Sequence, residues 1–278
     1  MKTSKLTKHL AGQYRTGVAT IRTLGVCLAA MTGLPCTSLG QAVPDDGDQL
    51  VVGDTAEIAG GTAAAWARVN GGGKVVWVGL TIPLSMVENM PPRGTGPAGA
   101  VAALNFPPVV QATTYFDHVQ IQSQLAGHPN GGADPNRYMT PHFDLHFMGI
   151  PVADVWAIPG GPFGAQVPAE RVPRGYLQPE NHSLPQMGRH SLALDEFLAT
   201  DHWLFTMIAG FLPDASYMHF IEPMITKEFL LSRKNFNLPV PAPAVLGRAT
   251  SYPTECLAHY DKDADAYHIV FKGFKPIE

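Results

Sequence analysis

Hydrophobic and polar residues alternate most regularly between residues 141 and 147, where the sequence is PHFDLHF. The apolar residues of this stretch alternate with His142, Asp144 and His146. A period of two predicts a β-strand with one apolar face, and it places the two imidazoles and the carboxylate on the other face. Such a row of side chains has the composition of a transition-metal site.

Shorter apolar patterns recur along the chain, with Gly and Pro residues between them. They predict strands at residues 51–58, 62–69, 74–82, 115–124, 203–210, 217–222, 254–260 and 267–274. A helical turn is predicted at residues 85–90, and a short helix at residues 226–234 with Thr226 as its N-cap. These patterns predict a mainly β fold, either a β-barrel or a sandwich of antiparallel hairpins, with one or two short helices and long Pro/Gly loops.

Two loops stand out by their length and composition. Residues 127–140 form a polar stretch that contains HPNGGADPN, and residues 159–189 form a long segment rich in Pro and Gly. Loops of the second kind are uncommon inside a compact domain, and they often serve binding or catalysis. We therefore expect the segment at residues 159–189 to cover a pocket or a neighbouring subunit.

The first 42 residues have the pattern of a secretory signal peptide. Residues 2–22 contain five basic residues and no acidic residue, and residues 24–35 form an apolar run too short to span a bilayer. Gly40 and Ala42 provide the small residues of a cleavage site, so we predict cleavage after Ala42 and export to the periplasm or the extracellular space. A disordered leader, or a lipid anchor on Cys36, are the alternatives.

Cleavage at this position would change the charge of the protein. Residues 43–49 would form a flexible linker and residues 50–278 a single β-rich domain, with 14 of the 19 basic residues, all 23 acidic residues and a net charge of about −9. A strongly acidic domain is not expected to bind nucleic acid, which selects a basic surface. No later apolar run is long enough to cross a membrane. Cys256 would be the one remaining cysteine, and we expect it to be buried.

The spacing of the residues at 142, 144 and 146 limits which of them can share one metal ion. Residues two apart in a strand are separated by about 6.6 Å, and residues four apart by about 13 Å. We therefore expect only adjacent members to share an ion, either His142 with Asp144 or Asp144 with His146. The third residue would orient a ligand, unless the strand contains a bulge.

Further ligands must come from other parts of the chain. The strongest candidates are His190 in MGRH and Glu222 in FIEPM, and the weaker ones are His118 and His128. Mixed imidazole and carboxylate ligands suit a divalent ion such as Zn, Mn, Fe, Ni or Cu. Two alternatives without metal are a buried hydrogen-bonded network that holds two sheets together and an acid/base site.

The stretches PHFDLHF, MGRH and FIEPMITKEFL and the closing YPT hairpin, in this order, resemble a family of bacterial exported proteins that carry a domain of unknown function. The resemblance covers roughly residues 50–274, and PHFDxHF and EPMIT are its specific motifs. The family includes a ring-forming member controlled by an extracytoplasmic-function sigma factor and its anti-sigma factor. The resemblance implies a β-rich fold, export and a homo-oligomer, and it implies no reaction.

These observations predict an exported protein with a His/carboxylate site that binds a divalent metal, with a role in the cell envelope or in a stress response. The same site would also suit a metal-dependent hydrolase or oxidoreductase, in which an open coordination position holds water or substrate. A non-catalytic assembly or binding protein, in which the His/Asp row is structural, is the third hypothesis.

Overall fold

Alternating strands dominate the chain, as the patterns of apolar residues predict. The computed structural model describes residues 47–130 and 132–278, which contain sixteen strands, five short α-helices and two 3-10 turns. The predicted signal peptide, including Cys36, and residues 43–46 of the predicted linker lie outside the described residues. All described residues belong to one structural unit.

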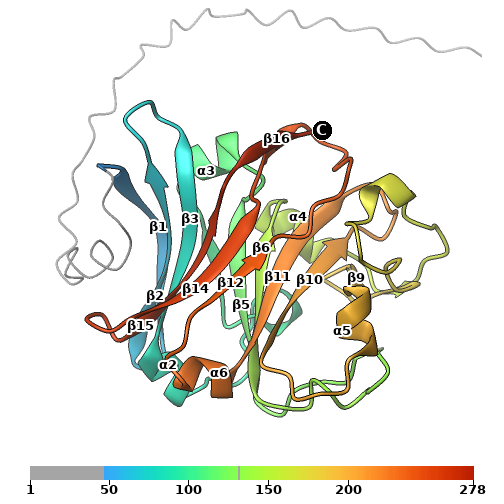
Figure 1. Cartoon of the computed structure of the whole chain (residues 1–278), viewed down its shortest axis with the longest axis horizontal. Coiled ribbons are helices and arrows are strands. Elements are labelled where there is room, and N and C mark those ends of the chain that lie inside the picture. Colours follow the sequence, from blue (N-terminus) through green and yellow to red (C-terminus); the bar gives the residue numbers. More distant parts are fainter. Residues whose placement is uncertain (1–46, 131) are drawn as a thin grey trace, which may run out of the picture. The chain divides into compact units, whose positions relative to one another are not determined.

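The first six-stranded sheet, sheet A, is antiparallel and lies at the left of Figure 1. Its strands follow the order β1 (Gln49–Ile58), β2 (Gly61–Val69), β3 (Val75–Pro83), β15 (Ala266–Lys272), β14 (Glu255–Asp261) and β12 (Phe236–Pro239). The hairpins predicted from residues 51–82 and 254–274 form β1 to β3 and β14 to β15. Pairing of β3 with β15 therefore joins the two ends of the described chain in one sheet.

The second six-stranded sheet, sheet B, is also antiparallel and carries the histidine strand. Its strands follow the order β4 (Ala102–Asn105), β5 (His118–Gln124), β6 (His142–Met148), β11 (Met218–Thr226), β10 (Phe205–Phe211) and β9 (Arg189–Ser191). Figure 1 shows β6, β11 and β10 side by side, with β9 at the edge. The strand predicted from the alternation at residues 141–147 is thus β6, at the centre of this sheet.

The two sheets pack through the apolar faces of their central strands. Phe147 of β6 contacts Phe271 of β15 with ring centroids 4.6 Å apart, and Phe116 lies 5.0 Å from the same ring. The sheets are open rather than closed into a barrel, so the mainly β prediction is confirmed in its sandwich form. Every residue of β6 is buried, which means that its polar face is covered as well as its apolar face.

The helices are short and more numerous than the one or two that the sequence predicts. They are α2 (Leu84–Glu88), α3 (Pro108–Thr113), α4 (Val152–Trp156), α5 (Leu194–Leu198) and α6 (Lys227–Leu231), with 3-10 turns η1 (Pro97–Gly99) and η2 (Ala169–Arg171). Thr226 caps α6 as predicted, because its hydroxyl accepts a hydrogen bond from the amide of Phe229 at 3.1 Å. None of the helices in the described part of the chain has the length and apolar character needed to cross a bilayer.

The remaining strands form two small sheets. One pairs β7 (Gly161–Pro162) with β8 (His182–Ser183), and the other pairs β13 (Thr250–Tyr252) with β16 (Lys275–Ile277). The segment predicted as a Pro/Gly loop therefore contains β7, η2 and β8. Cys256 is fully buried, as expected, and burial raises the pKa of its thiol.

Candidate metal centre

The polar face of sheet B, which points away from the core, is built by the register of its strands. In β5, Gln120, Gln122 and Gln124 pair with His146, Asp144 and His142 of β6, respectively. On the other side of β6, the pairing of Ile221 with Phe147 and of Met224 with Asp144 brings Glu222 of β11 alongside His146. Side chains two apart share a face, so these polar groups form one continuous surface on three strands.

Three of the candidate residues form a first group, in which Asp144 lies between two imidazoles. The Nε2 atom of His142 lies 3.0 Å from Oδ1 of Asp144, and the Nε2 atom of His128 lies 3.7 Å from Oδ2. Gln124 donates a hydrogen bond of 2.8 Å to Oδ2 of the same carboxylate. His142 and Asp144 come from β6, whereas His128 comes from the polar loop, so the loop closes the group.

The tautomers of the His142 and His128 rings follow from the hydrogen bonds that their Nδ1 atoms make. Nδ1 of His142 lies 2.7 Å from the carbonyl oxygen of Thr140, and Nδ1 of His128 lies 3.0 Å from that of Pro129. A carbonyl oxygen can only accept a hydrogen bond, so each Nδ1 carries the proton. In the neutral rings, both Nε2 lone pairs are therefore directed to Asp144, which is the arrangement of metal-binding histidines whose other nitrogen is held by the backbone.

The short contact between His142 and Asp144 is not a well-aligned hydrogen bond. Nε2 of His142 and Oδ1 of Asp144 both lack a hydrogen-bond partner within the described residues, although only 3.0 Å separates them. Both side chains are almost fully buried. Two buried lone-pair atoms at this distance repel each other unless a proton or a metal ion lies between them. The residues present therefore fit a cation.

His146, His190 and Glu222 form a second group. Nε2 of His146 lies 3.5 Å from Oε1 of Glu222, and Nε2 of His190 lies 3.9 Å from Oε2. Both ring nitrogens of His146 and Oε2 of Glu222 are buried without a hydrogen-bond partner in the described part of the chain. In each of the two groups, one ligand atom per residue lies within 4.8 Å of the others, so each group could hold a metal ion.

The ring of Phe220 contacts both imidazoles of the second group. Its centroid lies 5.0 Å from that of His146 and 5.3 Å from that of His190. This position requires Gly210 on the neighbouring strand, because a Cβ atom there would lie 1.9 Å from Cε1 of Phe220. The glycine therefore allows the phenyl ring to lie over the sheet and to fix the spacing of His146 and His190.

The ionisation of the second group is suppressed by burial. Burial lowers the pKa of His146 to about 3 and that of His190 to about 4, and both rings stay neutral at ordinary pH. Burial and the nearby charge of Asp144 raise the pKa of Glu222 well above its ordinary value. Without a cation, this carboxyl group is therefore held in its neutral form, and a bound metal ion would favour the ionised form.

The first group has the opposite electrostatic character. Burial acts to raise the pKa of Asp144, but interactions with His128 and His142 outweigh it and lower that pKa far below the ordinary value. Burial likewise acts to lower the pKa of His128, and its interaction with Asp144 raises that pKa instead. The carboxylate of the first group is thus ionised and attracts positive charge on its neighbours.

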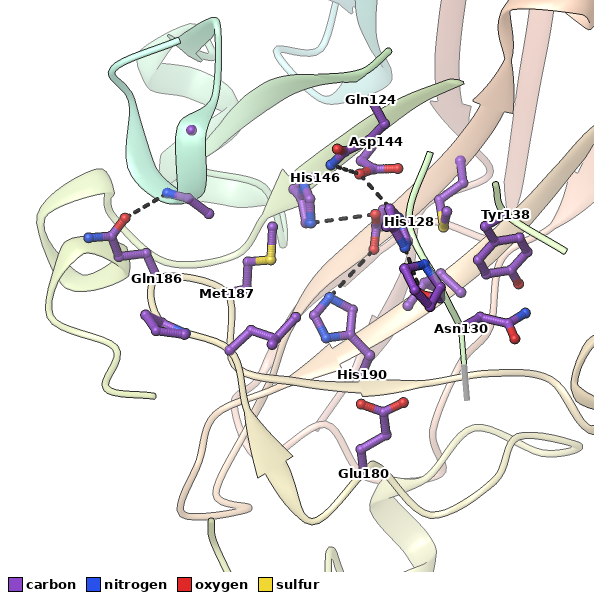
Figure 2. A pocket seen from close by; sticks show the side chains of 18 of the residues that line it. Gln124, His128, Asn130, Tyr138, Asp144, His146, Glu180, Gln186, Met187 and His190 are labelled. Atoms are coloured by element: carbon purple, nitrogen blue, oxygen red, sulfur yellow. Dashed lines mark hydrogen bonds and ion pairs between the residues drawn. The ribbon is translucent and has the colours of Figure 1, made fainter. Parts of the chain in front are cut away.

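A pocket of about 630 Å³ lies over both groups. Figure 2 shows His128, Asp144, His146 and His190 around this pocket, with ion-pair contacts between the strands and the loops. Residues 184–187 of the long loop supply part of its wall. The C-terminal part of the segment that the sequence singled out for its length therefore borders the pocket over the polar face of sheet B.

His118 lies apart from the two groups, at the other end of the β5–β6 pair, where it pairs with Met148. Its Nδ1 atom lies 3.0 Å from Oδ1 of Asp117, and its Nε2 atom lies 3.0 Å from the side-chain amide nitrogen of Gln120. Both nitrogens of His118 thus have partners in the protein. The structure brings His142 together with Asp144, and it groups His146 with residues of other strands rather than with Asp144.

Sequence reasoning missed the contacts that hold the loop carrying His128. Glu196 of α5 accepts hydrogen bonds of 2.8 Å from both Nε of Arg137 and the hydroxyl of Tyr138. The amide of His128 in turn donates to the carbonyl of Tyr138 at 3.1 Å. The only signal in the sequence was the presence of charged and aromatic residues in a polar loop, and their partner lies about sixty residues away.

The arrangement offers imidazole and carboxylate ligands at the floor of a pocket that a small molecule can enter. Three protein ligands per group leave coordination positions for water or another ligand. Comparisons with protein-family models, with curated proteins and with solved structures found no match for this chain.

Proposed function

We propose that the protein binds divalent transition-metal ions in the two His/carboxylate groups of sheet B. The contact between Nε2 of His142 and Oδ1 of Asp144 carries the proposal, because the two buried atoms lie 3.0 Å apart without a hydrogen-bond partner among the described residues, and a positive charge between them would stabilise this contact. The Nδ1 protons of His128 and His142 are already held by backbone carbonyls, so both rings are oriented before an ion binds.

The second group supports the same proposal independently. His146, His190 and Glu222 lie around a common point, and no arginine or lysine pairs with Glu222 among the described residues. Two histidines and one carboxylate suit Zn, Mn, Fe, Ni or Cu better than they suit Ca or Mg, which prefer oxygen ligands. We therefore propose up to two ions of this class for each chain.

A metal-dependent hydrolase or oxidoreductase is the second candidate, and the pocket over both groups favours it. A bound ion with an open position would polarise a substrate oxygen or lower the pKa of a bound water molecule. The residues of the pocket would exclude bulk water and orient the substrate. Glu180, whose pKa is raised mainly by burial, lines the same pocket and is placed to hold a proton near the ions.

Elemental analysis of the purified full-length chain tests the proposal. We expect about two equivalents of a transition metal per chain after equilibration with Zn²⁺ or Mn²⁺, and a lower melting temperature after chelation, because an ion that binds only the folded state stabilises it. A chain without stoichiometric metal whose stability does not respond to chelator would contradict the proposal. It would favour the alternative of a structural polar network.

Single substitutions separate the two groups. His142→Ala should lower the metal content of the first group, and His146→Ala that of the second, by about one equivalent each. His202→Ala is a matched control, because the side chain of His202 is 67% exposed and lies outside both groups. Full metal content in both His142→Ala and His146→Ala would show that the ions bind elsewhere.

A further inference from the structure

At the exposed edge of the pocket lies the guanidinium group of Arg93, which has no carboxylate partner among the described residues. Nη2 of Arg93 donates a hydrogen bond to the carbonyl of Ala98, and Arg93 forms no ion pair with any described residue. The guanidinium packs over Gly99, where a Cβ atom would lie 2.5 Å from Nε of Arg93. The absence of a side chain at Gly99 therefore makes room for this positive charge at the pocket.

The metal groups would add more positive charge to the same pocket. Two divalent ions carry four positive charges, and Asp144 and Glu222 can neutralise only two of them, because histidine ligands are neutral. Glu180 is the remaining carboxyl group of the pocket, and even in its ionised form it would add only one negative charge, equal to the positive charge of Arg93. The loaded pocket would thus hold about two uncompensated positive charges where water is partly excluded, which is unfavourable without an anion.

Apolar side chains line the pocket beside the polar ones, and two of them, Ile208 and Met224, pair across strands with Glu222 and Asp144. The pocket wall contains Leu184, Met187, Leu192, Ile208 and Met224, which come from the long loop and from strands β10 and β11 or their neighbourhood. Figure 2 shows Met187 between Gln186 and the rings of His146 and His190. A volume of about 630 Å³ exceeds what a water molecule or an inorganic anion would fill.

We propose that the pocket binds a small organic anion, with a carboxylate or phosphate head group toward the two metal groups and Arg93 and an apolar body against the wall. This inference rests on the proposed metal binding and names the substrate class of the same site. The two head groups share the chemistry that the site recognises, namely anionic oxygen atoms, which bind both metal ions and guanidinium groups.

Calorimetric titration of the metal-loaded full-length protein with four probes tests the inference. Phenyl phosphate and benzoate carry an anionic head on an apolar ring, benzamide is a neutral analogue, and inorganic phosphate is a head group alone. We expect at least one of the two organic anions to bind about tenfold or more tightly than benzamide. Phenyl phosphate should also bind more tightly than inorganic phosphate, since only the ester has a ring to bury. The better of the two organic anions identifies the head group.

Two variants and the metal-free protein provide the controls. Arg93→Gln should weaken the binding of the organic anion several-fold and leave both the metal content and the binding of benzamide unchanged. Met187→Ser should reduce the preference for phenyl phosphate over inorganic phosphate. Removing the metal should reduce the preference for the anions over benzamide to the part that Arg93 provides.

The outcomes distinguish this inference from the proposed function. If elemental analysis finds no metal, both fail together. If the metal is present but benzamide binds as tightly as benzoate and phenyl phosphate, or if Arg93→Gln leaves the affinity for both anions unchanged, the inference of an organic anion is overturned and the metal site stands. Equal binding of both anions to the metal-free protein would also overturn it.

Discussion

Single nitrogen atoms decide what the first group can bind, because the orientation of each imidazole ring determines which nitrogen faces Asp144. The carbonyl oxygens of Thr140 and Pro129 hold the Nδ1 protons of His142 and His128, and their Nε2 atoms consequently face Asp144. Another polar side chain in place of either ring would not hold one nitrogen on the backbone carbonyl and direct the other to Asp144. The site therefore depends on histidine itself rather than on polar character.

Gly210 provides a test at the residue scale. Gly210→Ala should place a methyl group within 1.9 Å of the ring of Phe220 and displace that ring. Because the ring contacts both His146 and His190, the variant should lose metal from the second group as well as about 1–3 kcal/mol of stability. Metal content and urea denaturation measure the two effects.

Gly79→Ala is the matched control for this prediction. A Cβ atom at Gly79 would lie 2.2 Å from Cζ2 of Trp66, so this variant should lose similar stability through a similar clash. Trp66 belongs to a separate small cluster on sheet A, and Gly79→Ala should keep its metal. Equal loss of metal in both variants would mean that the effect of Gly210→Ala comes from general destabilisation.

How much of the site could be predicted depends on how far apart its residues lie in the sequence. The alternation around Asp144 is local, and it was sufficient to predict β6 and the face that carries its polar side chains. The proximity of His146 to Glu222 depends on the pairing of β6 with β11, about eighty residues away. No local period encodes such a register, so the sequence named Glu222 as a candidate without identifying its partner.

At the scale of elements, loops rather than strands complete the site. The loop at residues 127–140 brings His128 to the first group, and its position depends on contacts with α5. Arg137 and Glu196 form a largely buried ion pair at 2.8 Å, with exposed side-chain fractions of 6% and 12%. The short helix α5 therefore supports the loop that carries the candidate ligand His128.

Glu196→Gln should loosen this loop while leaving β6 intact. Removing the charge weakens the hydrogen bonds to Arg137 and Tyr138, at a cost of about 2 kcal/mol. We expect weaker metal binding in the first group and unchanged binding in the second, which a metal titration resolves. Glu228→Gln is the control, because Glu228 pairs with His202 at an exposed position. Equal weakening of both groups would argue against a local effect.

The side chain of Arg189 is among the buried side chains that hold the long loop. Its guanidinium is fully buried and donates hydrogen bonds to four backbone carbonyls, those of Ala165, Pro179, Glu180 and Pro213. Arg189→Lys keeps the charge but cannot reach all four acceptors, and it should cost about 3 kcal/mol. Limited proteolysis should then cut residues 163–180 faster, whereas the exposed Arg174→Lys should behave like the unchanged protein.

At the scale of the whole molecule, sheet B is buried on both faces, and its second face is lined with titratable groups. These groups make stability depend on pH. Burial lowers the pKa of His219 to about 3, whereas the unfolded chain takes up a proton near 6.5. The unfolded state therefore binds more protons between these values, and this contribution to stability is complete above pH 6.5 and declines as the pH falls toward 3.

Replacing His219 isolates this contribution. In the presence of chelator, His219→Gln should lose less stability on acidification than the unchanged protein, by up to about 1.4 kcal/mol for each pH unit below 6.5. Urea denaturation at pH 7, 6 and 5 measures the difference. Parallel curves for the two proteins would show that His219 is protonated in the folded state in the same pH range as in the unfolded chain.

The position of His128 in a loop has a consequence for how fast the first group would exchange its metal ion. Five of the six candidate ligands belong to paired strands, whereas His128 belongs to a loop and its side chain is 38% exposed. An ion in the first group would leave by the route that the loop opens, since strand ligands separate only when the sheet does. The residence time of that ion would then follow the opening rate of the loop, and the two groups would exchange their ions on different timescales.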